Sequence, residues 1–188
     1  MKLASLGSPP AARFVRACSR VNRSFAFASG IAIILMMLVG GADVLLTNLD
    51  RIGFSSRPLP GMTEFVATMM VVAVFLAVPL AQQRRGHIQV DLVTQRLPAG
   101  ARRMASALQH LLSAAMFAAI AWFGWKTTAH AWSVGEFAAG SFDLPLWPAR
   151  FALALGSTVM TLQCMLDLAA DVQPALRHEL SRSAPLPD

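Results

Sequence analysis

A histidine and an aspartate four residues apart are the first candidates for chemistry in this sequence. They are His87 and Asp91, in the segment PLAQQRRGHIQVDL that covers residues 79–92. In a helix they would share one face, where an imidazole and a carboxylate could bind a metal ion. No other His, Cys or acidic residue lies nearby in the sequence to complete such a site. We therefore favour surface hydrogen bonds for His87 and an ion pair between Asp91 and a neighbouring arginine.

The histidines suggest a second kind of chemistry, because histidine pairs can hold haem between membrane helices. His110 and His130 belong to one predicted helical stretch, and the 20 residues between them correspond to about 30 Å of helix. These two side chains cannot bind the same iron. A pair of His87 and His110 stays open, with His87 expected in an interfacial loop. A standalone four-helix protein that binds haem, or a small interfacial enzyme, is therefore the alternative function.

The two cysteines and the known catalytic motifs offer no further site. Cys18 and Cys164 both fall on or near the side predicted to be cytoplasmic, where thiols stay reduced, and neither belongs to a C-x-x-C motif. The sequence has no glycine-rich phosphate loop after a strand, no G-x-S-x-G and no H-E-x-x-H. We expect no catalytic residue, bound cofactor or metal site in this chain.

Long uncharged stretches dominate the sequence. Of its 188 residues, 55% are apolar and 14% are charged, whereas soluble domains usually carry about a quarter charged residues. Four stretches of about 19 to 23 residues are almost free of charge, and as helices they would match the thickness of bilayer hydrocarbon. The sequence therefore predicts an all-α integral membrane protein with four transmembrane helices. The predicted spans are about 24–46, 62–83, 104–126 and 145–167.

These spans divide the chain into a basic N-terminal segment (1–23), a membrane domain (24–170) and a C-terminal tail (171–188). The first apolar run exceeds the roughly 7–15 residues of a signal-peptide core, so we expect it to be retained as a span. Residues 127–145 are expected to form a long loop that partly covers the outer side of the bundle.

The basic residues predict the orientation. Twelve of the 16 Lys and Arg residues precede the first span, separate the second from the third, or follow the fourth. The positive-inside rule then places both termini in the cytoplasm. The formal charge of +6 is thus a topology signal, with some attraction to anionic membrane lipids, and does not indicate a nucleic-acid partner. Four tryptophans, Trp122, Trp125, Trp132 and Trp147, are expected at the outer interface.

Acidic residues inside membrane spans are functional candidates by default. Asp43 and Glu64 lie near the outer ends of the first and second spans, with Arg51 and Arg57 available as partners on the same side. We predict an ion pair between Glu64 and Arg51. The middle thirds of the spans are almost wholly apolar, so the chain by itself is not expected to translocate a polar solute.

Two further patterns concern packing. Between Gly86 and Pro98 we expect a short amphipathic segment in the membrane interface, with Arg84 and Arg85 toward lipid phosphates. Small residues recur four apart, a spacing that lets helix backbones approach closely in lipid. We expect these pairs to pack inside the chain rather than to form a face for a specific partner. These pairs are Ala114 with Ala118, Ala115 with Ala119, and Ala152 with Gly156.

Several of these segments together resemble one family. LDRIGFSSRPLPGMTEF, followed by an apolar span and AVPLAQQRRGHIQVDLVTQRLP, is similar to the small Q-type (DctQ-like) membrane subunit of tripartite ATP-independent periplasmic (TRAP) transporters. WFGWK (122–126) and LPLWPARFALALG (144–156) resemble the ends of that family's third and fourth spans. Many members carry a second acid beside the glutamate, whereas Thr63 and Phe65 flank Glu64 here. The matching positions are Arg51, Pro58, Gly61, Glu64, Arg84, Arg85, Gly86, His87, Val90, Asp91, Leu97 and Pro98.

The resemblance implies a non-enzymatic scaffold subunit in the bacterial inner membrane. In this family, a periplasmic binding protein delivers an organic acid to a large multi-span permease subunit, which carries the substrate and sodium sites. The small subunit braces that permease and contacts the binding protein transiently. We therefore expect the large permease, the binding protein and membrane lipids as partners.

Overall fold

The computed structural model of the chain describes residues 10–51, 60–84, 98–138 and 143–172. Within these residues the fold is all-helical, apart from an isolated antiparallel β-bridge between Phe137 and Pro145. The helices are α1 (Pro10–Arg51), α2 (Met62–Gln83), α4 (Ala99–Val134) and α5 (Trp147–Val172). Each is long and apolar enough to cross a membrane, which confirms the predicted fold class.

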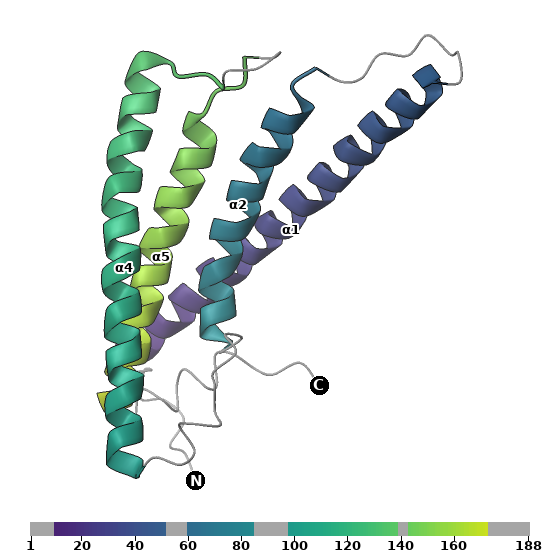
Figure 1. The fold of residues 1–188 in the computed structure, drawn as a ribbon. Helices are drawn as coiled ribbons and strands as arrows, with labels where there is room; N and C mark the ends of the chain where they lie inside the picture. The colour runs from purple at the N-terminus through teal and green to yellow at the C-terminus, as the bar shows by residue number, and fades with distance from the viewer. Residues whose placement is uncertain (1–9, 52–59, 85–97, 139–142, 173–188) are drawn as a thin grey trace.

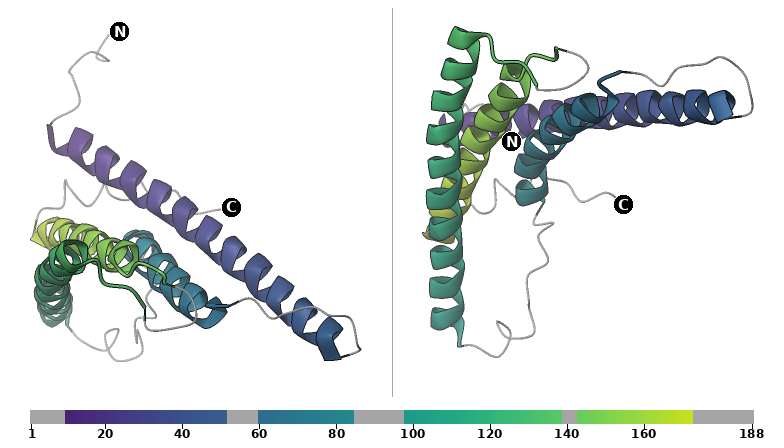
Figure 2. Two further views of the ribbon diagram at one scale, coloured as in Figure 1. Left: turned by 90° about the horizontal axis from the view of Figure 1, so that it is seen from above. Right: turned by 45° about the horizontal axis from the view of Figure 1, so that its top comes forward.

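The helices follow one another across the bundle in the order α4, α5, α2, α1 (Figure 1). α4 packs along α5, α5 packs on α2, and α2 packs on α1, while α1 has only slight contact with α5. Two further views show α1 running across one side of the other three helices (Figure 2). We call the end of the bundle at Arg51 and Trp147 the upper end, and the end at Gln83 and Val172 the lower end (Figure 1).

Two helices are longer than the predicted spans. α1 begins at Pro10 and continues through the basic N-terminal segment, where proline suits the first helical turn. α4 continues to Val134, so the first part of the segment expected to be a loop is helical. Between Lys126 and Val134 no Gly or Pro interrupts the helix, which ends at Gly135 in a left-handed conformation (φ 60°).

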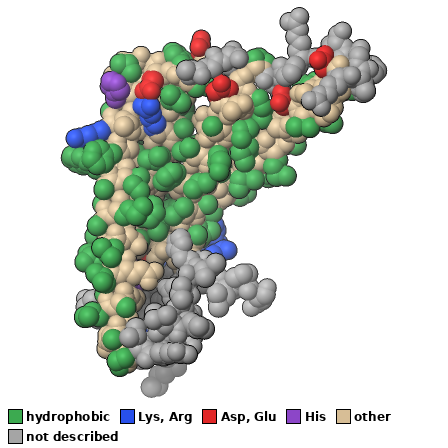
Figure 3. All heavy atoms as spheres, in the orientation of Figure 1, with side chains coloured by type: hydrophobic (Ala, Val, Ile, Leu, Met, Phe, Trp, Pro, Cys, Tyr) green, Lys and Arg blue, Asp and Glu red, His purple; other side chains and the backbone are tan. Residues whose placement is uncertain are grey.

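Buried residues lie along narrow seams on the helices. On α1, Val15, Asn22 and Ser29 are buried and lie seven residues apart. On α4 the buried positions follow one another in steps of three, four or seven, which is typical of nearly parallel helix packing, and the half-buried Phe117 lies within the step of seven. These α4 residues are His110, Ala114, Ala121, Gly124, Thr128 and Ala131. Apolar side chains cover the sides of the bundle, and acidic side chains gather at the upper end (Figure 3).

Candidate functional site

At the lower end, a network of amide and carboxylate side chains joins three helices. Asn22 on α1 is fully buried, and its Nδ2 donates to Gln83 Oε1 on α2 at 2.9 Å and to Gln163 Oε1 on α5 at 3.0 Å. Gln163 Nε2 donates to Asp167 Oδ1 at 3.2 Å, and Gln82 Nε2 donates to Asp167 Oδ2 at 2.9 Å. Both carboxylate oxygens of Asp167 thus accept an amide hydrogen.

This lower network ties helices that otherwise meet through apolar side chains. Interhelical hydrogen bonds in a membrane contribute about 0.6 kcal/mol on average, with a maximum of about 1.7 kcal/mol. Asn22 Oδ1 is buried without a hydrogen-bond partner among the described residues, so Asn22 joins the network through its Nδ2 group. Higher up, Ser29 Oγ donates to the Ala73 carbonyl oxygen at 2.6 Å and adds a second polar link between α1 and α2.

In the middle of the bundle, two glycines allow the helix backbones to approach closely. A Cβ placed on Gly156 of α5 would overlap the carbonyl group of Phe75 on α2. A Cβ on Gly124 of α4 would lie 2.9 Å from Leu153 Cδ2 and 3.2 Å from the Ala154 Cα on α5. The close approach predicted at Gly156 is therefore confirmed.

The alanine pairs predicted on α4 are a different case. Ala114 is buried in the seam against α5, whereas Ala115, Ala118 and Ala119 are exposed. The prediction of internal packing was wrong for these three residues. The reason is that the seam advances from residue 114 to 117, 121 and 124, so that positions 115, 118 and 119 turn away from α5.

At the upper end, an ion pair closes the connection between α4 and α5. Arg150 Nη1 and Nη2 each donate to one oxygen of the Glu136 carboxylate at 2.7 Å, and Nη1 also reaches the Thr127 carbonyl oxygen at 3.4 Å. About a third of each charged side chain is exposed. The backbone fixes Glu136, because its N–H donates to the Ala131 carbonyl oxygen and its own carbonyl oxygen accepts the Leu146 N–H.

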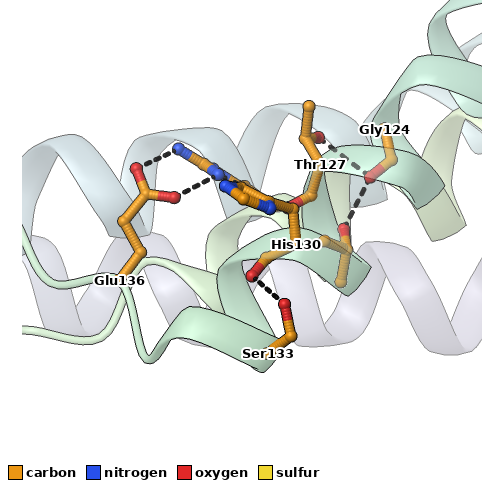
Figure 4. A network of polar contacts seen from close by, with 7 residues as sticks. Gly124, Thr127, His130, Ser133 and Glu136 are labelled. Carbon is orange, nitrogen blue, oxygen red and sulfur yellow. Dashed lines mark hydrogen bonds and ion pairs between the residues drawn. The ribbon is translucent and has the colours of Figure 1, made fainter.

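The last turns of α4 carry further polar contacts around this ion pair (Figure 4). The Thr127 and Thr128 hydroxyls donate to the Gly124 carbonyl oxygen, and Ser133 donates to the His130 carbonyl oxygen. Hydroxyls that bond back to their own helix leave few groups for a ligand. We name the Glu136–Arg150 pair the upper clamp.

Aromatic contacts reinforce the upper clamp. Trp132 on α4 and Trp147 at the start of α5 pack edge to face with ring centroids 4.9 Å apart, and Trp125 packs edge to face on Phe151 at 5.6 Å. The indole Nε1 of Trp125 donates to Thr158 Oγ1 at 3.1 Å. Such edge-to-face pairs contribute about 0.5–1.5 kcal/mol beyond the area that they bury.

Trp122 is exposed, and the Lys126 ammonium nitrogen lies over its ring, 5.1 Å from the ring centroid. All four tryptophans lie in the upper half of α4 or at the start of α5, and the two pairings across these helices involve three of them. Their position at the membrane interface stays a prediction.

The other predicted site residues have separate places in the structure. Gly61 is buried and caps α2 in a left-handed conformation (φ 76°), with its carbonyl oxygen accepting the Phe65 N–H. Glu64 is half-buried in the first turn of α2. Arg51 is the last residue of α1, and its side chain lies outside the described structure, so the Arg51–Glu64 ion pair stays a prediction.

At the opposite end of α2, Arg84 is exposed and caps the helix by donating its N–H to the Leu80 carbonyl oxygen. The remaining site candidates of that segment lie outside the described residues, as does the predicted interfacial segment. They are Arg85, Gly86, His87 and Asp91.

Sequence reasoning missed both the lower network and the upper clamp. A signal existed for each, since Gln163 and Asp167 lie one helical turn apart in an apolar span and Arg150 is a lone charge near the start of that span. Among the described residues, no group of three or more His, Cys, Asp or Glu side chains could hold a metal ion. The described polar groups instead connect helices to one another.

Comparison with known proteins identifies the sequence pattern. The family model of the DctQ component of tripartite ATP-independent periplasmic transporters matches residues 36–173. A comparison with curated proteins finds no match. The matched range covers α2, α4, α5 and the second part of α1, and it includes the upper clamp and most residues of the lower network.

Proposed function

Because the chain belongs to the DctQ component family of tripartite ATP-independent periplasmic transporters, we propose that this inner-membrane subunit acts as a static brace for a large permease subunit. The main support for this proposal is that the described polar side chains form contacts between helices of this chain. The lower network and the upper clamp join helices of this chain to one another, as expected of a rigid support.

In the proposed transport cycle, the partner proteins bind the substrate and the sodium. A periplasmic binding protein would capture an organic acid and dock transiently on the assembly, and the large permease would couple its uptake to sodium. This chain would hold neither sodium nor substrate and would catalyse no reaction. Exposed apolar residues along α1 and α4 offer surfaces for the permease and for lipid acyl chains.

Co-purification tests the assembly. The tagged chain, expressed in its native host and extracted in mild detergent, should retain a large multi-span permease in stoichiometric amount, as measured by mass spectrometry. Extraction directly into lipid nanodiscs controls for loss in detergent. A chain that is recovered alone under both conditions would contradict the proposal.

Uptake assays test the coupling. Proteoliposomes that contain both membrane subunits and the binding protein should accumulate a radiolabelled organic acid only with an inward sodium gradient. Omitting this chain should abolish uptake without removing substrate affinity from the isolated binding protein. Equal uptake with and without the chain would show that it is dispensable for transport.

A further inference from the structure

Beyond the bracing role, the lower part of α1 has a basic surface that the scaffold function does not use. Arg16, Ser19, Arg20 and Arg23 line a surface hollow of about 170 Å³. Their spacing of three and four residues places them on one helical face. The hollow is well above the roughly 10–15 Å³ that a single water molecule requires, so a phosphate group can enter it.

The charge around this hollow favours an anion. The three arginines are exposed, and α1 carries no Asp or Glu before Asp43, while Asp167 of the neighbouring α5 accepts amide hydrogens from Gln82 and Gln163 in the lower network. The guanidinium group presents planar, paired donors that match phosphate oxygens. Arg16 and Arg23 directly follow the buried residues Val15 and Asn22, about 100° further around α1, and both remain exposed. The arginine face therefore lies on the flank of the buried seam.

The same face of α1 becomes apolar immediately above the arginines. Phe27, Ile31, Ile34 and Leu38 are all exposed, and their spacing from Arg20 in steps of seven, four, three and four keeps them on the arginine face. A ligand that lies along this face meets cationic donors at one end and hydrocarbon side chains along the rest. A phospholipid has this arrangement of groups, whereas free phosphate does not.

We propose that Arg20 and Arg23, at the hollow that Arg16 and Ser19 also line, bind the phosphate of an anionic phospholipid whose acyl chains lie along Phe27, Ile31, Ile34 and Leu38. Such a lipid joins the lower part of α1, which packs on its neighbours along one narrow seam, to the surrounding leaflet. The site does not depend on which leaflet faces the lower end.

Lipid binding to the purified full-length chain tests this site. Native mass spectrometry of delipidated protein titrated with phosphatidylglycerol or phosphatidylcholine gives the affinity for each lipid. We expect the double variant Arg20→Gln/Arg23→Gln to bind phosphatidylglycerol about tenfold more weakly, because each basic residue near an anionic surface contributes a several-fold factor. Arg16 stays unchanged because it has another interaction in the structure.

The matched control is Arg102→Gln/Lys126→Gln, which removes two exposed positive charges from α4. This control should keep wild-type affinity, and both double variants should unfold at the wild-type midpoint because the changed side chains are exposed. Equal loss in both variants, or equal binding of the two lipids by the wild type, would overturn the site. Binding of soluble glycerol phosphate as tight as that of phosphatidylglycerol would overturn the assignment to a lipid.

Discussion

Asn22 illustrates at the residue scale how one amide can hold three helices. Its two donor hydrogens reach acceptors on α2 and α5, and the side chain is fully buried. In an apolar surrounding, the two glutamine acceptors would have to find other donors if Asn22 were lost. The cost of losing this residue is therefore larger than that of losing a surface asparagine.

We expect Asn22→Ala to lower the free energy of unfolding by about 1–2 kcal/mol, since two interhelical hydrogen bonds disappear. Unfolding by sodium dodecyl sulfate in mixed micelles, followed by circular dichroism, measures the change. Asn48→Ala is the control on the same helix, because Asn48 is exposed and bonds only to the Val44 carbonyl oxygen of its own helix. Indistinguishable midpoints for the two variants would argue against the network.

Gly156 is a second example at the residue scale. One methyl group added at this position would prevent the close approach of α2 and α5. Gly156→Ala places a Cβ against the backbone of Phe75, which cannot move as a flexible side chain can. Overpacking of this kind costs about 1–3 kcal/mol. The same unfolding titration should show this loss, while Gly30→Ala, with no atom within 4 Å of its Cβ, should not. A Gly156→Ala variant as stable as wild type would rule out the close contact.

At the scale of elements, the upper clamp holds together the two sides of the connection between α4 and α5. The helix end at Gly135, the β-bridge and the Glu136–Arg150 pair lie within a few residues of one another along the connection. Each partner is partly exposed, so the ion pair gains less than a buried one would. Its two parallel hydrogen bonds nevertheless fix the geometry of the pair.

A double-mutant cycle separates the ion pair from the other contacts of these residues. Glu136→Gln and Arg150→Gln should each destabilise the chain, and their coupling free energy should be about 1 kcal/mol or less. The exchange Glu136→Arg/Arg150→Glu should recover part of the loss, as measured by thermal unfolding in detergent. Strictly additive single effects, without recovery in the exchanged variant, would exclude an energetic role for the pair.

At the scale of the whole molecule, four apolar helices present most of their large side chains outward. This arrangement suits a protein that is surrounded by lipid and by another membrane subunit. The lower end carries Arg84 and the exposed arginines of α1, and the upper end carries Glu64 and the upper clamp. The positive-inside rule predicts that the lower end faces the cytoplasm.

Cysteine labelling tests this orientation. In a background with Cys18→Ser and Cys164→Ala, a membrane-impermeant maleimide should label Ser133→Cys in spheroplasts but should label Gly100→Cys only after permeabilisation. Both positions are exposed and lie near opposite ends of α4, so they form a matched pair on one helix. Labelling of Gly100→Cys from outside would reverse the predicted topology.

The sequence by itself determined the four membrane-spanning helices of the described residues and their all-helical class, because an uncharged stretch of bilayer length is a local property that composition reveals. It also indicated the close approach at Gly156, because Ala152 and Gly156 lie four residues apart, a spacing that lets helix backbones approach closely in lipid. The resemblance to the family was also visible in the sequence, in short motifs around the ends of the spans.

Only the tertiary structure decided which residues meet across helices. Asn22 pairs with Gln83 and Gln163, which lie 61 and 141 residues away, and Glu136 pairs with Arg150 across a turn. These pairings depend on the rotation of each helix about its axis and on its tilt. Packing of the seams against neighbouring helices sets both quantities, and no local pattern encodes them. For the same reason Ala114 is buried against α5 while Ala115 and Ala118 remain exposed.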